Sequence, residues 1–111
     1  MTPTRWRLLF WAALIFAFVM AVLPHPPRLP GDPGDKIQHI VAFTVLGLLG
    51  HFAFREVPAL RLIAGLSLFG ALIEMVQTIP ALNRDGDIVD WIADTLAVIA
   101  VLGLLRLVRK R

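Results

Sequence analysis

Four apolar runs, separated by short segments rich in proline, glycine and charged residues, divide the chain. They cover residues 8–23, 37–54, 62–79 and 88–107, and each is 16–20 residues long. An α-helix needs roughly 20 apolar residues to cross a hydrocarbon core of about 30 Å, and only helices or closed barrels satisfy the backbone there. The pattern therefore predicts an all-α membrane protein with four transmembrane helices, in a single domain over residues 1–111.

The first run could be mistaken for a secretory signal peptide, because Arg5 and Arg7 precede it. It ends in the sequence MAVLPHPPRLP, however, which contains no clear small-x-small cleavage site. We therefore interpret this run as an uncleaved first helix, with Trp6 and Trp11 as anchors at the membrane interface.

The composition agrees with a membrane protein. Apolar residues make up 58% of the chain and charged residues 17%, whereas typical soluble proteins have about 45–50% and about 25%. The absence of cysteine excludes disulfides and thiolate metal sites. The net charge is +3 and the pI about 10.6, but the basic residues form short clusters between apolar runs. We therefore expect the lipid bilayer, and not a nucleic acid, as the partner.

The distribution of Lys and Arg predicts the orientation, because basic residues concentrate on the cytoplasmic side of membrane proteins. One side of the predicted bundle carries Arg28, Lys36 and Arg84. Both termini are therefore predicted to be cytoplasmic, with residues 24–36 and 80–87 facing outward. The cytoplasmic side would carry Arg5, Arg7, Arg55, Arg61, Arg106, Arg109, Lys110 and Arg111.

The polar residues within the runs are expected to gather in the outward half of the bundle. At about 1.5 Å per residue, Glu74 lies roughly 8 Å from the end of its run and Asp94 roughly 9 Å from the start of its own. A short turn joins these two runs, so both carboxylates are predicted to lie at the same depth. His51 lies toward the opposite end of its run, and we interpret it as an interfacial side chain. The predicted outward-facing pocket consists of Asp35, Lys36, His39, Glu74, Gln77, Arg84, Asp90 and Asp94.

Helix capping explains part of this pattern. Asp35 and Asp87 stand where a side chain caps the second and fourth helices. Asp90 would occupy the third helical position, where the helix dipole favours a carboxylate, so capping and a pocket role both remain open for it. Capping explains neither Asp94, which is too deep, nor Glu74, which is near a C-terminal end where the dipole disfavours an anion.

A carboxylate at mid-membrane costs about 2.5–3.5 kcal/mol on insertion scales, so it needs partners or water. Glu74 and Asp94 therefore belong either to a buried polar network that clamps the helices or to a functional pocket. Three glycines, at positions 47, 50 and 70, are placed to line close helix contacts.

Three short motifs resemble the VanZ-like family of membrane proteins. They are DKIQH at residues 35–39, EMVQ at 74–77 and R-x-x-D-x-x-D-x-x-x-D-T at 84–95. The family pattern is DK-x-x-H, E-x-x-Q and R-x-x-S-x-x-D-x-x-x-N-T-x-G, in the same order and on the same side of the membrane. The resemblance covers about residues 35–105, most of the chain.

The chain departs from this pattern at Asp87, where the family often has Ser, at Asp94, where it usually has Asn, and at Ala97, where Gly is common. The first two changes make the pocket more acidic, and they argue against any role that needs a neutral amide at position 94. The resemblance implies a small multi-pass protein of the bacterial inner or plasma membrane. The name-giving member is linked to teicoplanin resistance, but no molecular activity is established for the family.

The first function hypothesis is a non-enzymatic protein of the cell envelope. It would affect glycopeptide susceptibility, a form of antibiotic resistance, or bind a lipid-linked or glycopeptide-like polar group. Lys36 and Arg84 would contact anionic groups, while Glu74, Asp90 and Asp94 would contact amines or sugar hydroxyls. No cofactor is expected under this hypothesis.

The alternative is a membrane-embedded enzyme acting on a lipid-linked substrate. His39, Glu74 and Asp90 are then the candidate acid–base residues. Asp90 and Asp94 with His39 could also hold a divalent cation, although their spacing is not a specific metal motif. A proton or ion path is disfavoured, because the polar residues are expected in only one half of the membrane.

Overall fold

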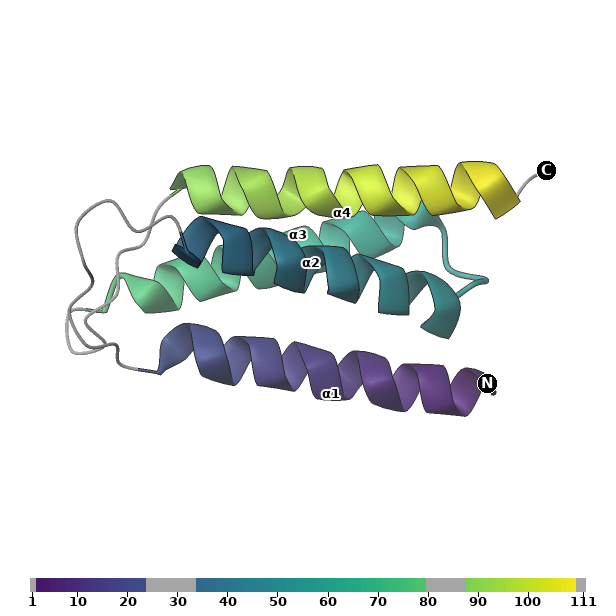
Figure 1. The fold of residues 1–111 in the computed structure, drawn as a ribbon, viewed down its shortest axis with the longest axis horizontal. Helices are drawn as coiled ribbons and strands as arrows, with labels where there is room; N and C mark the ends of the chain where they lie inside the picture. Colours follow the sequence, from purple (N-terminus) through teal and green to yellow (C-terminus); the bar gives the residue numbers. More distant parts are fainter. Residues whose placement is uncertain (1, 24–33, 80–87, 110–111) are drawn as a thin grey trace.

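The computed structural model describes residues 2–23, 34–79 and 88–109, and every regular element in these ranges is an α-helix. The four helices are α1 (Pro3–Val22), α2 (Gly34–Ala53), α3 (Ala59–Gln77) and α4 (Ile88–Arg109) (Figure 1). The predicted all-α class is therefore confirmed, and each helix overlaps the apolar run that predicted it.

The first helix begins earlier than its apolar run. The Thr2 side chain accepts a hydrogen bond from the Arg5 amide at 3.3 Å, and Pro3 occupies the first helical position. Proline suits this position because its missing N–H would have no partner inside the helix. The polar residues before the run therefore form the first turn of α1.

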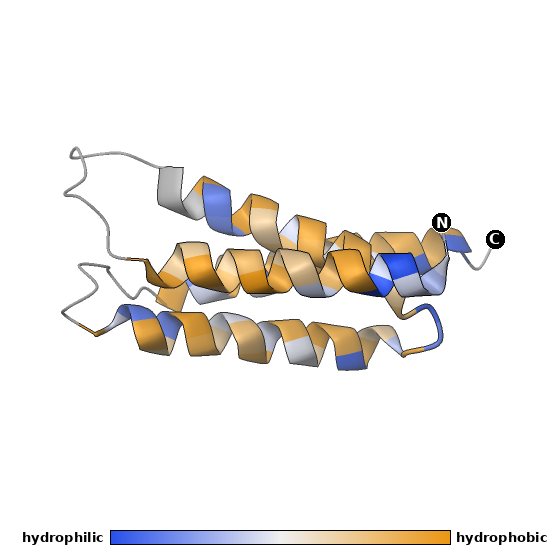
Figure 2. Cartoon of the chain, turned by 90° about the horizontal axis from the view of Figure 1, so that it is seen from below, coloured by the Kyte–Doolittle hydropathy of each residue, from blue (hydrophilic) through white to orange (hydrophobic). Residues whose placement is uncertain are grey.

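Three of the helices, α1, α3 and α4, are long and apolar enough to cross a membrane, and the apolar part of α2, Ile37–Ala53, is shorter. Apolar residues extend along most of each helix (Figure 2). Large side chains such as Leu68 and Met75 are 72% and 70% exposed. Continuous exposed apolar surface is rare on soluble monomers and suits lipid contact. The structure therefore indicates a membrane protein.

The helices form an elongated bundle in which consecutive helices run in opposite directions, so α2 and α4 are parallel (Figure 1). The second helix packs against α1 and α4, and α4 also packs against α3. Both termini lie at one end of the bundle. The buried apolar core of the described residues consists of Phe10, Phe43, Leu46, Ala53, Leu66, Ile73, Val98 and Leu102.

Glycines allow the close approach of α2 to its neighbours, as the sequence predicted. A Cβ atom at Gly47 would lie 2.5 Å from Cγ1 of Val101, and one at Gly50 would lie 3.3 Å from the ring of Phe10. Gly70 on α3 likewise faces aromatic rings of α2 and α4. Gly47 is the tightest of these contacts, so a larger residue there would force α2 away from α4 or displace Val101.

Two polar pairs join α2 to α4, one near each end of their interface. Nδ1 of His39 lies 3.0 Å from Oδ2 of Asp94, and Nε of Arg106 donates to Nδ1 of His51 at 2.9 Å. Both pairs join residues 55 positions apart in the sequence. From His39 to His51 on α2, and from Asp94 to Arg106 on α4, the helix rises by roughly the same 18 Å. A single alignment of the two parallel helices therefore forms both pairs. Apolar residues fill the buried face of α4 between the pairs.

Arg106 fastens the end of the bundle that holds the termini. Besides its bond to His51, it donates from Nη1 to the Val57 carbonyl at 2.7 Å and from Nη2 to the Phe54 carbonyl at 3.2 Å. Arg106 is 8% exposed and His51 is 3% exposed. His51 lies in the last turn of α2, at the depth expected for an interfacial residue, but its side chain is buried. The expectation that the polar residues gather in one half of the bundle only is wrong. The fork of the guanidinium satisfies backbone carbonyls where α2 ends, which is why a charged residue is buried there.

Candidate functional site

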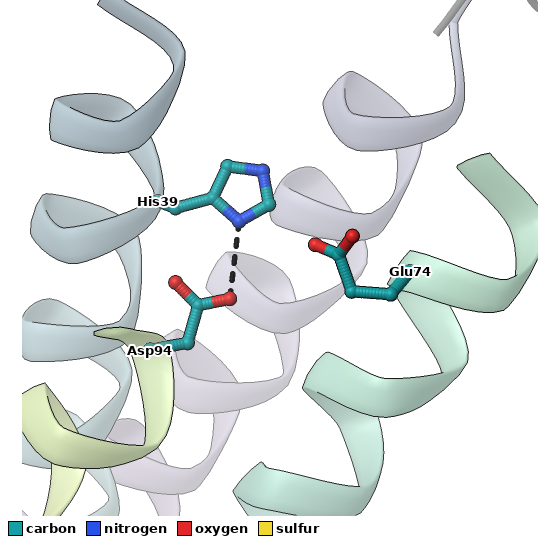
Figure 3. Close-up of side chains that lie close together, drawn as sticks. All are labelled: His39, Glu74 and Asp94. Atoms are coloured by element: carbon teal, nitrogen blue, oxygen red, sulfur yellow. Dashed lines mark hydrogen bonds and ion pairs between the residues drawn. The ribbon is translucent and has the colours of Figure 1, made fainter. Parts of the chain in front are cut away.

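Three polar side chains from three helices converge at the end of the bundle opposite the termini (Figure 3). His39 comes from α2, Glu74 from α3 and Asp94 from α4. One nitrogen or oxygen atom from each lies within 4.8 Å of the other two. All three side chains are largely buried, with Asp94 only 1% exposed. We call these residues the polar triad.

The local geometry follows from where each residue lies in its helix. His39 is near the start of α2, Glu74 near the end of α3 and Asp94 just beyond the first turn of α4. Because α3 runs opposite to the other two, these positions reach the same level, and the predicted match in depth between Glu74 and Asp94 is confirmed. Phe43 and Val98, one turn further along, close the apolar core beneath the triad.

His39 and Asp94 form a directly bonded pair, and the Glu74 carboxylate points toward it (Figure 3). When Asp94 is ionised, Nδ1 of His39 donates the proton in their 3.0 Å hydrogen bond. This orients the ring and leaves its other nitrogen as a proton acceptor. Without its proton, Nδ1 could instead share a cation with Oδ2 of Asp94. The pair can therefore act as a proton acceptor or contribute to a cation site.

Two further predicted pocket residues are buried outside the triad. Asp90 lies one turn before Asp94 on α4 and is 3% exposed. The side-chain amide of Gln77 donates from Nε2 to the Ala21 carbonyl at 2.9 Å, which joins α3 to the end of α1. The side chains whose ligand atoms lie close enough together to hold a cation are His39, Glu74 and Asp94, whereas the sequence suggested Asp90 in place of Glu74. Asp90 is one turn nearer the start of α4 than Asp94, so it lies at a different level of the bundle.

The remaining predicted pocket residues fall on parts of the chain that the structure does not describe. Asp35 and Lys36 belong to the first turn of α2, and their side chains are outside the described set. Arg84 lies between α3 and α4, in residues 80–87, outside the described ranges, and so does Asp87, the predicted cap of the fourth helix. The membership of Asp35, Lys36 and Arg84 in the pocket stays a prediction.

An apolar groove of about 490 Å³ lies between α1 and α2, beside the triad. Its α1 wall contains Ala13, Ala17 and Ala21, spaced one turn apart, and its α2 wall runs from Ile37 to Leu46 and includes His39. The small alanine side chains leave room where larger residues would pack against α2. Sequence reasoning did not find this groove, although the alanine spacing was its signal.

The site thus joins a buried polar end to an apolar groove, and His39 belongs to both. Comparison with known protein families, curated proteins and solved structures finds no match to this chain.

Proposed function

We propose that this chain is a VanZ-like, multi-pass protein of the bacterial cell envelope that binds the polar end of a lipid-linked ligand. The observation that carries the proposal is the joining of the polar triad to the α1–α2 groove at His39. A ligand with a polar head and an aliphatic chain matches both parts. The head would contact the triad, and the chain would lie in the groove.

Lateral access favours a membrane lipid over a free glycopeptide as the ligand. The groove lies between two helices with exposed apolar faces, including Phe16 at 66% and Val41 at 56%. A lipid chain can enter such a groove from the hydrocarbon core without crossing water. An effect on glycopeptide susceptibility would then arise indirectly, through lipid-linked precursors of the envelope.

The proposal includes four membrane spans, with α2 as the fourth. Its apolar part, Ile37–Ala53, rises by about 26 Å at 1.5 Å per residue, close to the thickness of a hydrocarbon core of about 30 Å. The Lys and Arg distribution supports cytoplasmic termini, so the triad would face outward.

Cysteine labelling tests this orientation, and the absence of native cysteine makes single-cysteine variants unambiguous. We expect Asn83→Cys to react with a membrane-impermeant maleimide in intact cells. The matched variant Glu56→Cys, in the segment between α2 and α3, should react only after permeabilisation. The reverse pattern would show that the triad faces the cytoplasm.

A susceptibility assay tests the function. Overexpression of the wild-type chain is expected to change susceptibility to a teicoplanin-type glycopeptide. Glu74→Gln, which removes the charge of one triad residue, and Ala17→Phe, which fills the groove, should return susceptibility to that of the empty vector. Ala12→Phe places the same ring on an exposed face of α1 and should retain the effect.

Ala17→Phe tests the groove and Glu74→Gln tests the polar triad, provided that immunoblots show equal amounts of each variant in the membrane. Retention of the effect by Ala17→Phe would remove the groove from the proposal. Retention by Glu74→Gln as well would show that the site is only structural.

The bonded His39–Asp94 pair beside Glu74 supports a second candidate, a membrane-embedded acid–base enzyme. Incubation of the purified chain with lipid-linked envelope precursors distinguishes the two. An enzyme would release a changed product, whereas a binding protein would return the lipid intact.

A further inference from the structure

We propose that the polar triad binds one divalent transition-metal cation, with Zn²⁺ as the best match. The inference deepens the proposed function, since the cation would form the polar end of the lipid site, but it rests on the triad's own geometry. The ligands would be Nδ1 of His39 and carboxylate oxygens of Glu74 and Asp94. Binding would release the Nδ1 proton, so the cation would replace the hydrogen bond between His39 and Asp94.

The chemistry of the three donors suits such a cation. Imidazole is a good ligand for Zn²⁺, and carboxylate oxygens bind it at about 2.0–2.2 Å. Two carboxylates also neutralise a divalent charge, which lowers the cost of holding the cation in an apolar bundle. Three protein ligands leave at least one coordination position for an external group, as in catalytic zinc sites.

The distances are those of a preformed site that closes slightly on binding. Two ligands bound to Zn²⁺ at tetrahedral angles lie about 3.3 Å apart, and Nδ1 of His39 lies 3.0 Å from Oδ2 of Asp94. The third donor, from Glu74, is within 4.8 Å of the others. Glu74 has the longest side chain of the three, so a change of rotamer brings its oxygens closer without moving a helix.

The helices hold the donors in place. The second pair between α2 and α4, His51 with Arg106, fixes the register that sets His39 opposite Asp94. Phe43 and Val98 are buried one turn below His39 and Asp94, so apolar side chains occupy the core side of the site. Rigid donors from different helices bind a cation with little loss of conformational entropy.

A bound cation would also reverse the electrostatic preference of the site. Carboxylates alone repel an anionic head group, whereas a divalent cation between them attracts a phosphate oxygen. This gives the groove and the triad a shared ligand class, an anionic lipid whose head completes the coordination.

Metal binding by the full chain, purified in detergent with a histidine-free tag, tests the inference. After Zn²⁺ loading and dialysis, we expect about one bound ion per chain by mass spectrometry and saturable binding in competition with a chromophoric chelator. Asp94→Ala and His39→Ala should each weaken binding by at least about 100-fold, because each removes a ligand. Glu74→Gln should weaken it while retaining the shape of the side chain.

Asp90→Asn is the matched control, since Asp90 is a buried acid on the same helix outside the cation cluster. It should retain Zn²⁺ affinity. Equal losses in Asp90→Asn and Asp94→Ala would overturn the assignment, as would the absence of saturable Zn²⁺ and Mn²⁺ binding by wild type. Circular dichroism identifies any variant that fails to fold. If an alanine variant does, the Zn²⁺ affinity of Glu74→Gln tests the site instead, and an unchanged affinity would overturn the assignment.

The metal measurement uses the purified chain and the susceptibility assay uses cells, so the two proposals fail separately. Stoichiometric Zn²⁺ binding without a susceptibility effect would refute the envelope function and leave the metal site intact. A susceptibility effect without Zn²⁺ binding would refute the metal site alone.

Discussion

Replacing Arg106 by methionine is expected to lower the free energy of unfolding by about 2–4 kcal/mol. The guanidinium is 8% exposed and donates to His51 and to the carbonyls of Phe54 and Val57. Methionine fills similar space but donates no hydrogen bond, so these acceptors lose their partner at the end of α2. Arg106→Lys should recover only part of the loss, because an ammonium group does not reproduce the planar fork.

Arg109→Met is the matched control for this prediction. Arg109 is one turn further along α4, exposed, and bonded to a single carbonyl, that of Arg55. Its replacement should change stability by no more than about 0.5 kcal/mol. Reversible unfolding in detergent, followed by circular dichroism, measures both variants. Equal effects of the two substitutions would show that Arg106 acts only through charge near the membrane surface.

Breaking the hydrogen bond between His39 and Asp94 is expected to lower the free energy of unfolding as much as replacing Arg106 does. His39→Leu and Asp94→Val should each lower the free energy of unfolding by about 2–4 kcal/mol, because each leaves a buried polar group without this hydrogen bond. The double variant should cost at least about 1 kcal/mol less than the sum of the two, since it removes both partners together. All three variants should lose Zn²⁺ binding.

The combination of Asp94→Val with Arg106→Met provides the control for coupling. These residues are roughly 18 Å apart along α4 and share no partner among the described hydrogen bonds, so their effects should add to within about 0.5 kcal/mol. Additive effects of His39→Leu and Asp94→Val would instead show that the observed contact contributes no coupling. If the double variant His39→Leu/Asp94→Val is more stable than the two single effects predict but still binds no Zn²⁺, the contribution of the pair to stability is separate from its role as a metal ligand.

Much of the fold follows from the order of apolar and polar residues along the chain. Apolar runs near 20 residues predicted all four helices. Helices α1, α2 and α3 begin earlier than their runs, and the difference is largest for α1, where Thr2 and Pro3 form a helix start. The depth of Asp94, too far into its run for capping, predicted that it would meet Glu74. That prediction needed only the helical rise and a short connection between antiparallel neighbours.

The contacts that the sequence did not predict share one physical origin. Partners such as His51 for Arg106, and the Ala21 carbonyl for Gln77, depend on how each helix rotates about its axis and on its register against a neighbour. In soluble helices an apolar stripe reveals that rotation, but α1 is apolar on all sides, because lipid and protein core select the same residue types. The sequence places Arg106 with the basic residues of the predicted cytoplasmic side, beside Arg109, and does not show that its side chain is buried.

The sequence by itself determined the membrane class, the four helices and the level at which the deep carboxylates lie, because each depends on composition and on distance along one helix. The tertiary structure alone decided that Nδ1 of His39 bonds to Asp94, that Arg106 turns inward, and that a groove opens between α1 and α2. These features depend on side-chain shape at helix contacts, where Gly47 brings α2 onto α4 and the small alanines of α1 leave space against α2.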